Sequence, residues 1–292
     1  MSPAGALPAA PHMPSSAPFA CAATVPQPRF LPMFIDSHCH LSFPELSARL
    51  PEILGEMMVA QVEQAICICT TMEEFPRVAG LAADHAPLFA TVGVHPDNED
   101  VHEPSVAELV QGAQAPKVVA IGETGLDYFR LNGRNIEHDM EWQRERFRTH
   151  IRAAREASKP LVIHTRSSAA DTLRVLDEEG GEHAGGVFHC FTESLAVAQA
   201  AVERGYYISF SGILSFKNAQ DLRDMAKALP IERLLIETDS PYLAPVPYRG
   251  RTNSPAYVPH VAAALAAAKG MSIPDLAAQT TANTRRLFSL PV

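Results

Sequence analysis

The chain has 292 residues, of which 47% are hydrophobic and 20% are charged, and its formal net charge is −9. This composition can bury a large core and argues against an intrinsically disordered protein. The acidic balance argues against a protein that coats itself in nucleic acid through a basic surface, although bound divalent cations would still create a local site for anions.

Residues 1–32 differ in composition from the rest of the chain. They contain eight prolines and eight alanines, and Arg29 is their only strongly basic residue. The prolines interrupt the apolar run that a secretory signal peptide needs. We predict that this segment is a disordered tail or reflects a start codon assigned too early, with Met33 as the true start. The folded domain is expected to cover residues 33–292.

Eight short apolar runs follow, and each is predicted to be a strand. Runs such as 118–121 and 161–163 are almost continuously apolar, which is typical of parallel strands covered on both faces. The predicted strands are residues 33–37, 65–70, 88–94, 117–122, 161–164, 186–190, 206–210 and 234–238.

The five cysteines are scattered and show no repeated spacing. This pattern argues against a disulfide framework and favours a reducing compartment. Cys67 and Cys69 lack the spacing of a zinc ribbon or redox motif, so we interpret them as small core residues. Because no apolar run is long enough to span a bilayer, we expect a cytoplasmic protein without membrane contact.

The segments between the strands have helical periodicity. Apolar residues recur at helical spacing in 141–157, while 167–179 opens with a serine suited to capping and 218–229 ends before a proline. Alternating strands and helices predict parallel βαβ units. We therefore expect an α/β protein whose single domain is a (β/α)₈ TIM barrel, with a doubly wound open sheet as the alternative.

Side chains that bind metal ions stand at the ends of most predicted strands. The C-terminal ends of barrel strands meet at one rim, where active sites form, so residues distant in sequence would converge there. The residues concerned are His38 and His40 after the first strand, then His95, Glu123, His164, His189 and Asp239 after the third, fourth, fifth, sixth and eighth.

His38 and His40 are expected to bind one ion together, because alternate residues of a strand point to the same side. Imidazole suits zinc, manganese, iron or cobalt, and carboxylates also accept magnesium. A carboxylate can bridge two cations, and Glu123 is the candidate bridge. We predict two divalent ions (Mg, Mn or Zn), one held by His38, His40, Glu123 and Asp239 and the other by Glu123, His164 and His189.

Such a pair of ions would share a water molecule, lower its pKa towards neutrality and stabilise an in-line displacement. Asp239 is predicted to bind metal and also to accept the proton of that water as general base. Glu237 is expected to lie behind the ligands rather than among them.

Six segments resemble successive motifs of the TatD family of metal-dependent nucleases. The similarity extends from Met33 to about Phe288, and the motifs follow one another in the family's order. The segments are MFIDSHCHL at 33–41, GVHP at 93–96, GETGLDY at 122–128, IH at 163–164, FHCF at 188–191 and IETDSPY at 236–242.

The resemblance implies a TIM barrel that binds divalent ions and hydrolyses DNA, often from the 3′ end. It also implies metal ligation by the six residues already selected from the strand ends. Two positions depart from the family's pattern: Thr124 stands where isoleucine is frequent, and Asn253 where many relatives carry an acidic residue before proline. Because that second loop can shape the substrate site, the departure bears on substrate choice more than on metal binding.

Four further residues are candidates for substrate binding. His95 either contacts the scissile phosphate, which is the favoured interpretation, or fixes the loop after the third strand. Arg166 either clamps a phosphate or forms a surface ion pair. Arg249 and Arg251 either meet an extended nucleic-acid backbone or belong to a solvated loop.

The leading functional hypothesis is phosphodiester hydrolysis, by a 3′–5′ exonuclease acting on DNA and also on RNA. The alternative is a metal-dependent ester or amide hydrolase, such as an aminoacyl-tRNA deacylase or a small-molecule amidohydrolase. Many of the latter use a carbamylated lysine from strand four, where this chain has Glu123, which disfavours that branch. A metal-stabilised binding module is a third hypothesis, disfavoured because structural metal sites are usually closed tetrahedra. The oligomeric state stays open.

Overall fold

A computed structural model describes residues 33–291 together with Met1 and Gly5. Apart from those two residues, the predicted tail at 1–32 lies outside the described residues. Among the described residues, no single helix is long and apolar enough to cross a membrane. One bent pair, Pro255–Lys269 with Ile273–Phe288, reaches the necessary length and composition.

Eight parallel strands form one sheet in which each strand pairs with the next along the chain. Residues beyond the last strand close the sheet on the first, since the Asp239 N–H donates to the His38 carbonyl (2.9 Å) and the His40 N–H to the Ser240 carbonyl (2.8 Å). The single-domain TIM barrel is therefore confirmed, and the open-sheet alternative is wrong. The strands are β1 (Phe34–Cys39), β2 (Val62–Cys67), β3 (Leu88–Val92), β4 (Val118–Asp127), β5 (Leu161–Arg166), β6 (Gly186–Phe188), β7 (Tyr207–Phe210) and β8 (Leu234–Ile236).

All eight strands were predicted, but several bounds were wrong. The largest error concerns β4, which continues to Asp127 instead of ending at Gly122. It stays paired with β5 as far as Asp127 opposite Arg166, after an irregularity in register between Ile121 and Thr124. Pairing with β5 thus keeps residues 123–127 in the strand. From the local sequence alone, their polar side chains indicated that the strand had already ended.

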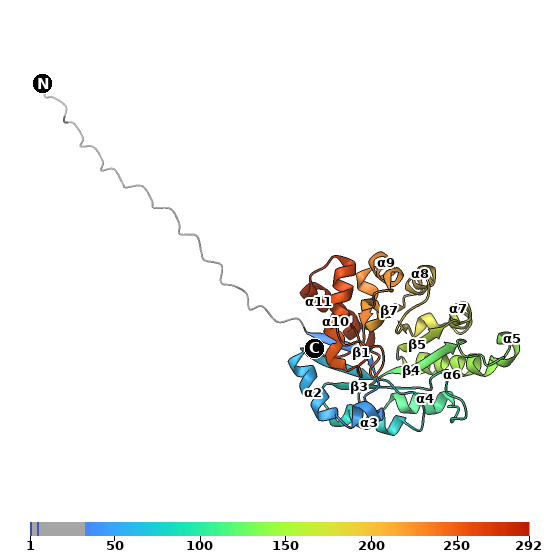
Figure 1. The fold of residues 1–292 in the computed structure, drawn as a ribbon. Coiled ribbons are helices and arrows are strands. Elements are labelled where there is room, and N and C mark those ends of the chain that lie inside the picture. The colour runs from blue at the N-terminus through green and yellow to red at the C-terminus, as the bar shows by residue number, and fades with distance from the viewer. Residues whose placement is uncertain (2–4, 6–32, 292) are drawn as a thin grey trace. The chain divides into compact units, whose positions relative to one another are not determined.

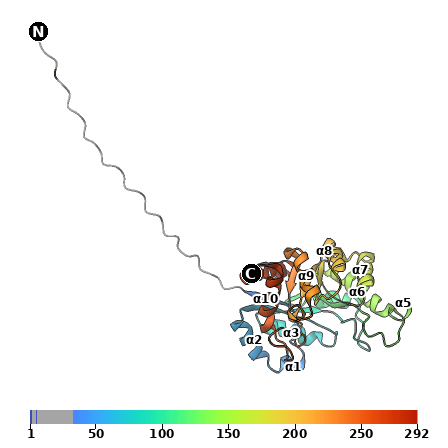
Figure 2. The ribbon, with the colours of Figure 1, turned by 45° about the horizontal axis from the view of Figure 1, so that its top comes forward.

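Helices surround the strands on the outside of the barrel (Figures 1 and 2). They are α1 (Pro44–Ser47), α2 (Leu50–Val59), α3 (Phe75–Asp84), α4 (Val106–Ala113), α5 (Ile136–Asp139), α6 (Glu141–Ala157), α7 (Ala169–Glu178), α8 (Leu195–Glu203), α9 (Gln220–Ala228), α10 (Val258–Lys269) and α11 (Ile273–Phe288). Four short 3₁₀ turns complete the described part: η1 (Gly181–His183), η2 (Gly212–Ser215), η3 (Ile231–Arg233) and η4 (Pro255–Tyr257).

The three helices predicted in detail are all present. Helix α6 has the predicted bounds, and α7 and α9 differ from the predictions by one or two residues at each end. The prediction that Ser167 caps this helix was wrong, because the N-cap position of α7 is Ser168, and the Ser168 side chain makes no cap. Its hydroxyl instead donates to the Leu126 carbonyl at 2.7 Å, which ties the start of α7 to β4.

The apolar core has two parts. The larger part lies between strands and helices and includes Cys67 and Cys69, as predicted. The smaller part is built from residues of all eight strands and packs against the end of α11. Its members are Ile35, Ile66, Ile68, Phe89, Val119, Ala120, Val162, Val187, Tyr207, Leu235, Phe288 and Leu290. Successive strands thereby hold their carboxyl ends, and the side chains there, in fixed register.

Candidate metal centre

His38 and His40 project to the same side of the barrel, as the alternation of strand residues predicts. Both are buried, and their Nε2 atoms lie 3.2 Å apart. His38 is the penultimate residue of β1, and His40 is the first residue after the strand. Two imidazole nitrogens therefore converge on one point at the carboxyl end of the first strand.

Two carboxylates complete this group of nitrogens. Glu123 Oε2 lies 3.5 Å from His38 Nε2 and 4.0 Å from His40 Nε2. Asp239 Oδ1 lies 3.6 and 3.4 Å from the same two atoms. The four residues come from β1 and the residue directly after it, from β4 and from the loop after β8, and all four are the ones predicted for one ion.

The spacing of these four atoms fits a metal ion. Ligands at about 2.0–2.1 Å from a tetrahedral ion lie about 3.3–3.4 Å from one another. The five measured separations run from 3.2 to 4.0 Å. Two imidazoles and two carboxylates also form a donor set that zinc or manganese accepts. His38, His40 and Glu123 thus form a group that could hold one divalent cation, and Asp239 lies close enough to both histidines to join it.

A second group forms around the other oxygen of Glu123. Its Oε1 lies 2.8 Å from His189 Nε2 and 3.3 Å from His164 Nδ1, and those two nitrogens are 3.4 Å apart. The outer nitrogen of each ring faces a further carboxylate. His164 Nε2 lies 3.0 Å from Asp127 Oδ2, and His189 Nδ1 lies 3.3 Å from Glu237 Oε1. Partners of this kind fix the ring orientation and tautomer of a metal-binding histidine.

Glu123 therefore presents one oxygen to each group, at the centre of the site. Burial raises the pKa of its carboxyl, but the imidazoles of His189, His95 and His38 outweigh burial and hold the pKa well below its usual value. Burial likewise opposes a charge on His189, yet Glu123 and Glu237 raise its pKa well above the ordinary value. The cluster concentrates negative charge that cations would neutralise.

Two glycines allow the strands around Glu123 to approach closely. A Cβ on Gly125 would lie 2.0 Å from the His164 carbonyl oxygen, and this residue has a φ of +126°. A Cβ on Gly93 would lie 2.6 Å from the carbonyl carbon of Gly122. Both glycines belong to the motifs noted in the sequence, and each allows a strand that carries a candidate ligand to lie against its neighbour.

His95 lies beside the second group but is oriented differently from the ligands. The Asp97 N–H donates to its Nδ1 at 3.1 Å, while its Nε2 faces Glu123 Oε1 at 3.4 Å. Burial lowers the pKa of His95 to about 3, so the ring is neutral. A neutral ring that accepts at Nδ1 carries its proton on Nε2. His95 is therefore a hydrogen-bond donor towards the cavity rather than a free lone pair for a metal.

The three arginines predicted to contact substrate differ in position. Arg166 lines a cavity of about 700 Å³ together with five of the candidate ligands, His40, Glu123, His164, His189 and Asp239. Its guanidinium lies 3.6 Å from the Phe129 ring centre. Arg249 and Arg251 are exposed and do not line this cavity. Arg249 instead lies over Phe216 and donates to the Ala244 carbonyl at 3.3 Å.

Comparison with known proteins assigns the family. The model of the family described as TatD related DNase matches residues 35–289. The chain belongs to the TatD family. It is 42% identical over 260 residues to the uncharacterized metal-dependent hydrolase YcfH of Escherichia coli strain K12, covering 88% of this chain and 96% of YcfH.

Other TatD proteins are similar over the same length. The protein named 3′-5′ ssDNA/RNA exonuclease TatD of Klebsiella pneumoniae strain 342 is 33% identical over 263 residues, covering 88% of this chain and 98% of that protein. The crystal structure of YJJV, a TatD homolog of Escherichia coli K12, superposes with a TM-score of 0.81 at 31% identity, covering 88% of this chain and 98% of that one. The chain is therefore a metal-dependent hydrolase of the TatD family.

Sequence reasoning missed two acidic residues that organise this TatD centre. Asp127 is the penultimate residue of the GETGLDY segment and contacts His164. Asp36 is fully buried and accepts hydrogen bonds from the Thr238 N–H (2.9 Å), the Thr238 hydroxyl (2.5 Å) and the His38 N–H (3.2 Å). It thereby joins β1 to the loop that carries Asp239. Each of these aspartates lies inside a motif already noted in the sequence, and that position was the signal that could have identified both as site residues.

Proposed function

We propose that this TatD-family hydrolase removes nucleotides from the 3′ end of DNA, and also of RNA, using two divalent ions. The single observation that carries the proposal is that the two carboxylate oxygens of Glu123 face different groups of histidines. Its Oε2 faces His38 and His40, and its Oε1 faces His164 and His189. A bridging carboxylate between two ligand sets is the arrangement of enzymes that clamp both oxygens of an in-line phosphoryl displacement.

Divalent ions bound between these side chains would lower the pKa of a water molecule and offset the negative charge that develops on the phosphate. Asp239 is the residue we propose as proton acceptor. Its Oδ1 lies within 3.6 Å of both nitrogens of the first group, and its side chain is 15% exposed towards the cavity. It is thus the carboxylate of the cluster that a cavity water reaches most easily.

Two residues on the other side of the cavity would hold the substrate. The Nε2–H of His95 is placed to donate to a phosphate oxygen, because its Nδ1 is engaged by the Asp97 N–H. Arg166 makes no side-chain ion pair among the described residues, and the Phe129 ring supports one face of its guanidinium. Its N–H edges are therefore free for a phosphate, which a guanidinium binds in bidentate fashion.

The test is a nuclease assay with matched variants. Purified protein is incubated with 5′-labelled single-stranded DNA and manganese or magnesium, and a ladder that shortens from the 3′ end and stops with EDTA is expected. His164→Ala should be inactive. His183→Ala removes an exposed histidine of η1, which precedes the amino end of β6, whereas the cluster lies at the carboxyl ends of the strands, so this variant should retain parental activity. Intact oligonucleotides combined with deacylation of charged tRNA would reject the proposal in favour of the ester-hydrolase alternative.

Asp239→Asn separates metal binding from proton transfer. The amide keeps an oxygen ligand but is a far weaker base, so we expect most of the bound metal to remain while turnover falls to background. Metal content is measured by elemental analysis of the purified variant beside the parent protein. Activity close to that of the parent would reject Asp239 as the proton acceptor.

A further inference from the structure

Two aromatic rings flank the first group of ligands at the rim of the cavity. Phe43 stacks on His40, with ring centres 4.7 Å apart and an angle of 18° between the planes. Tyr242 meets Phe43 edge to face, with centres 6.3 Å apart at 74°. Both rings line the cavity, and Tyr242 is 54% exposed. An apolar surface thus adjoins the highly charged cluster.

Tyr242 is held on a rigid loop although its ring is open to solvent. The buried Asn253 amide donates to the Tyr242 carbonyl (2.6 Å) and to the Thr238 carbonyl (2.8 Å), and the Asn253 N–H donates to the Pro241 carbonyl (3.0 Å). The Tyr242 N–H in turn donates to the carbonyl of Asp239 at 3.0 Å. The backbone that carries the ring is therefore held close to Asp239, the candidate metal ligand three positions earlier.

We propose that Tyr242, backed by Phe43, is a stacking platform for the base of the nucleotide at the scissile end. This inference rests on the proposed function and names the residue that receives the terminal base. Every nucleobase has a π face, so stacking on an aromatic ring is strong and tolerant of sequence. A base inside a duplex is already stacked and paired, and must be extruded at a cost before it can reach such a ring.

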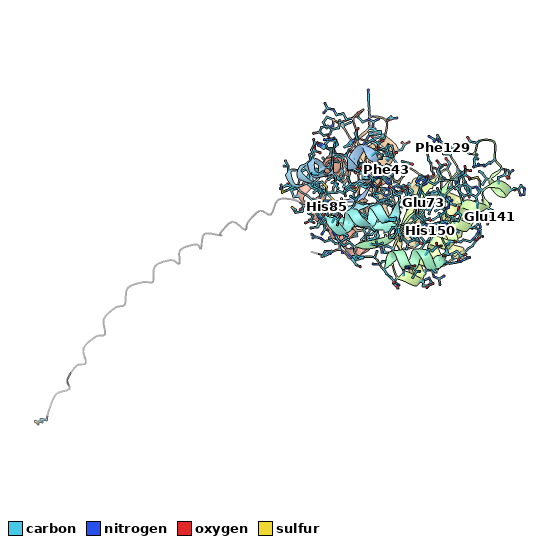
Figure 3. The ribbon with its side chains drawn as sticks, turned by 90° about the horizontal axis from the view of Figure 1, so that it is seen from below. Phe43, Glu73, His85, Phe129, Glu141 and His150 are labelled. Carbon is cyan, nitrogen blue, oxygen red and sulfur yellow. The ribbon has the colours of Figure 1, made fainter. Side chains whose placement is uncertain are left out.

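The other exposed aromatic ring near the cavity is less suited to this role. Phe129 is 56% exposed, but the Arg166 guanidinium lies 3.6 Å from its centre and covers one face. It does not line the cavity, whereas Phe43 does. Figure 3 labels Phe43 and Phe129 on two separate loops. The Phe129 side therefore supplies support for a phosphate-binding cation, and the Tyr242 side supplies the surface for a base.

The experiment measures stacking without turnover. A short single-stranded oligonucleotide with 2-aminopurine at its 3′ end is titrated with protein in EDTA, and its fluorescence is recorded together with its anisotropy. The parent protein should quench the 2-aminopurine, because stacking on an aromatic ring quenches this base. Tyr242→Leu should not quench and should bind about 5- to 150-fold more weakly. Tyr242→Phe keeps the ring and should behave as the parent.

A second substrate separates base stacking from phosphate binding. An oligonucleotide with an abasic 3′ residue should bind the parent protein and Tyr242→Leu equally well. Equal quenching and equal affinity of the normal oligonucleotide for both proteins would overturn the platform. If ring-dependent quenching occurs while no oligonucleotide is cut in the presence of metal, the platform stands and the proposed nuclease activity fails. If cutting occurs without dependence on the ring, the nuclease stands and the platform fails.

Discussion

His150 offers a test of how the barrel holds the loop that carries His95. It lies on α6, labelled in Figure 3, and is fully buried. Its Nε2 accepts from the Val94 N–H at 3.0 Å, and its Nδ1 donates to the Arg146 carbonyl at 2.8 Å. This pair of bonds requires a neutral ring, since a proton on Nε2 would face the Val94 N–H. Burial accordingly lowers the pKa of His150 to about 4.

The pKa difference predicts a loss of stability in acid. The folded protein releases the His150 proton at lower pH than the unfolded chain, whose histidine titrates near its ordinary value of 6.5. Between these two values the unfolded state binds more protons, so the free energy of unfolding falls as the pH falls from about 6.5 to about 4. A shift from 6.5 to about 4 corresponds to about 2 kcal/mol lost at pH 5 and about 3 kcal/mol below pH 4.

The assay is urea unfolding in EDTA at pH 7 and pH 5, comparing the parent protein with His150→Gln. Glutamine can still accept from Val94 but does not titrate, so the parent should lose about 2 kcal/mol more than the variant over this interval. His183→Gln, which changes an exposed histidine, should show the same loss as the parent. An equal loss in the parent and His150→Gln would refute the assignment of a buried neutral ring.

Two further predictions concern the ligand groups. Asp127→Asn removes the charge that lies 3.0 Å from His164 Nε2, and a 10- to 100-fold loss of metal affinity or activity is expected. Titrating the metal-free variant with manganese checks this, and parental affinity would contradict it. Gly125→Ala introduces a Cβ against the His164 carbonyl at a φ of +126°, so β4 and β5 must separate locally. We expect a loss of about 1–3 kcal/mol in unfolding free energy together with loss of activity. A variant with the melting temperature and turnover of the parent would contradict this, because it would show that the two strands accommodate the added Cβ.

Much of the barrel could be predicted because its signals are local. A run such as Val118–Ile121 is apolar on both sides, and only a strand covered on both faces needs that pattern. The rim is then set by topology, since parallel strands end together. His38, His40 and Asp239 could be placed at one site for this reason, without any knowledge of side-chain packing.

The end of β4 could not be predicted in the same way. Glu123 and Thr124 are buried polar residues within the strand, and in the sequence they resemble the start of a loop. Their burial depends on neighbours contributed by other strands, namely the histidines that surround Glu123. A rule based on apolar runs fails at a functional site, because the site places charge where the core would otherwise be apolar.

The positions of the arginines relative to the cavity could not be predicted from the sequence either. Arg166 is the last residue of β5 and Arg249 lies in the loop after β8, and the sequence beside each one predicts a phosphate contact equally well. The difference comes from the side chain that each one covers. Phe129 belongs to the loop after β4, so Arg166 stays at the cavity, whereas Phe216 follows η2 and holds Arg249 outside it. Whether an arginine faces the cavity is therefore decided by contacts between segments that only the folded barrel brings together, while the positions of the candidate metal ligands follow from where strands end.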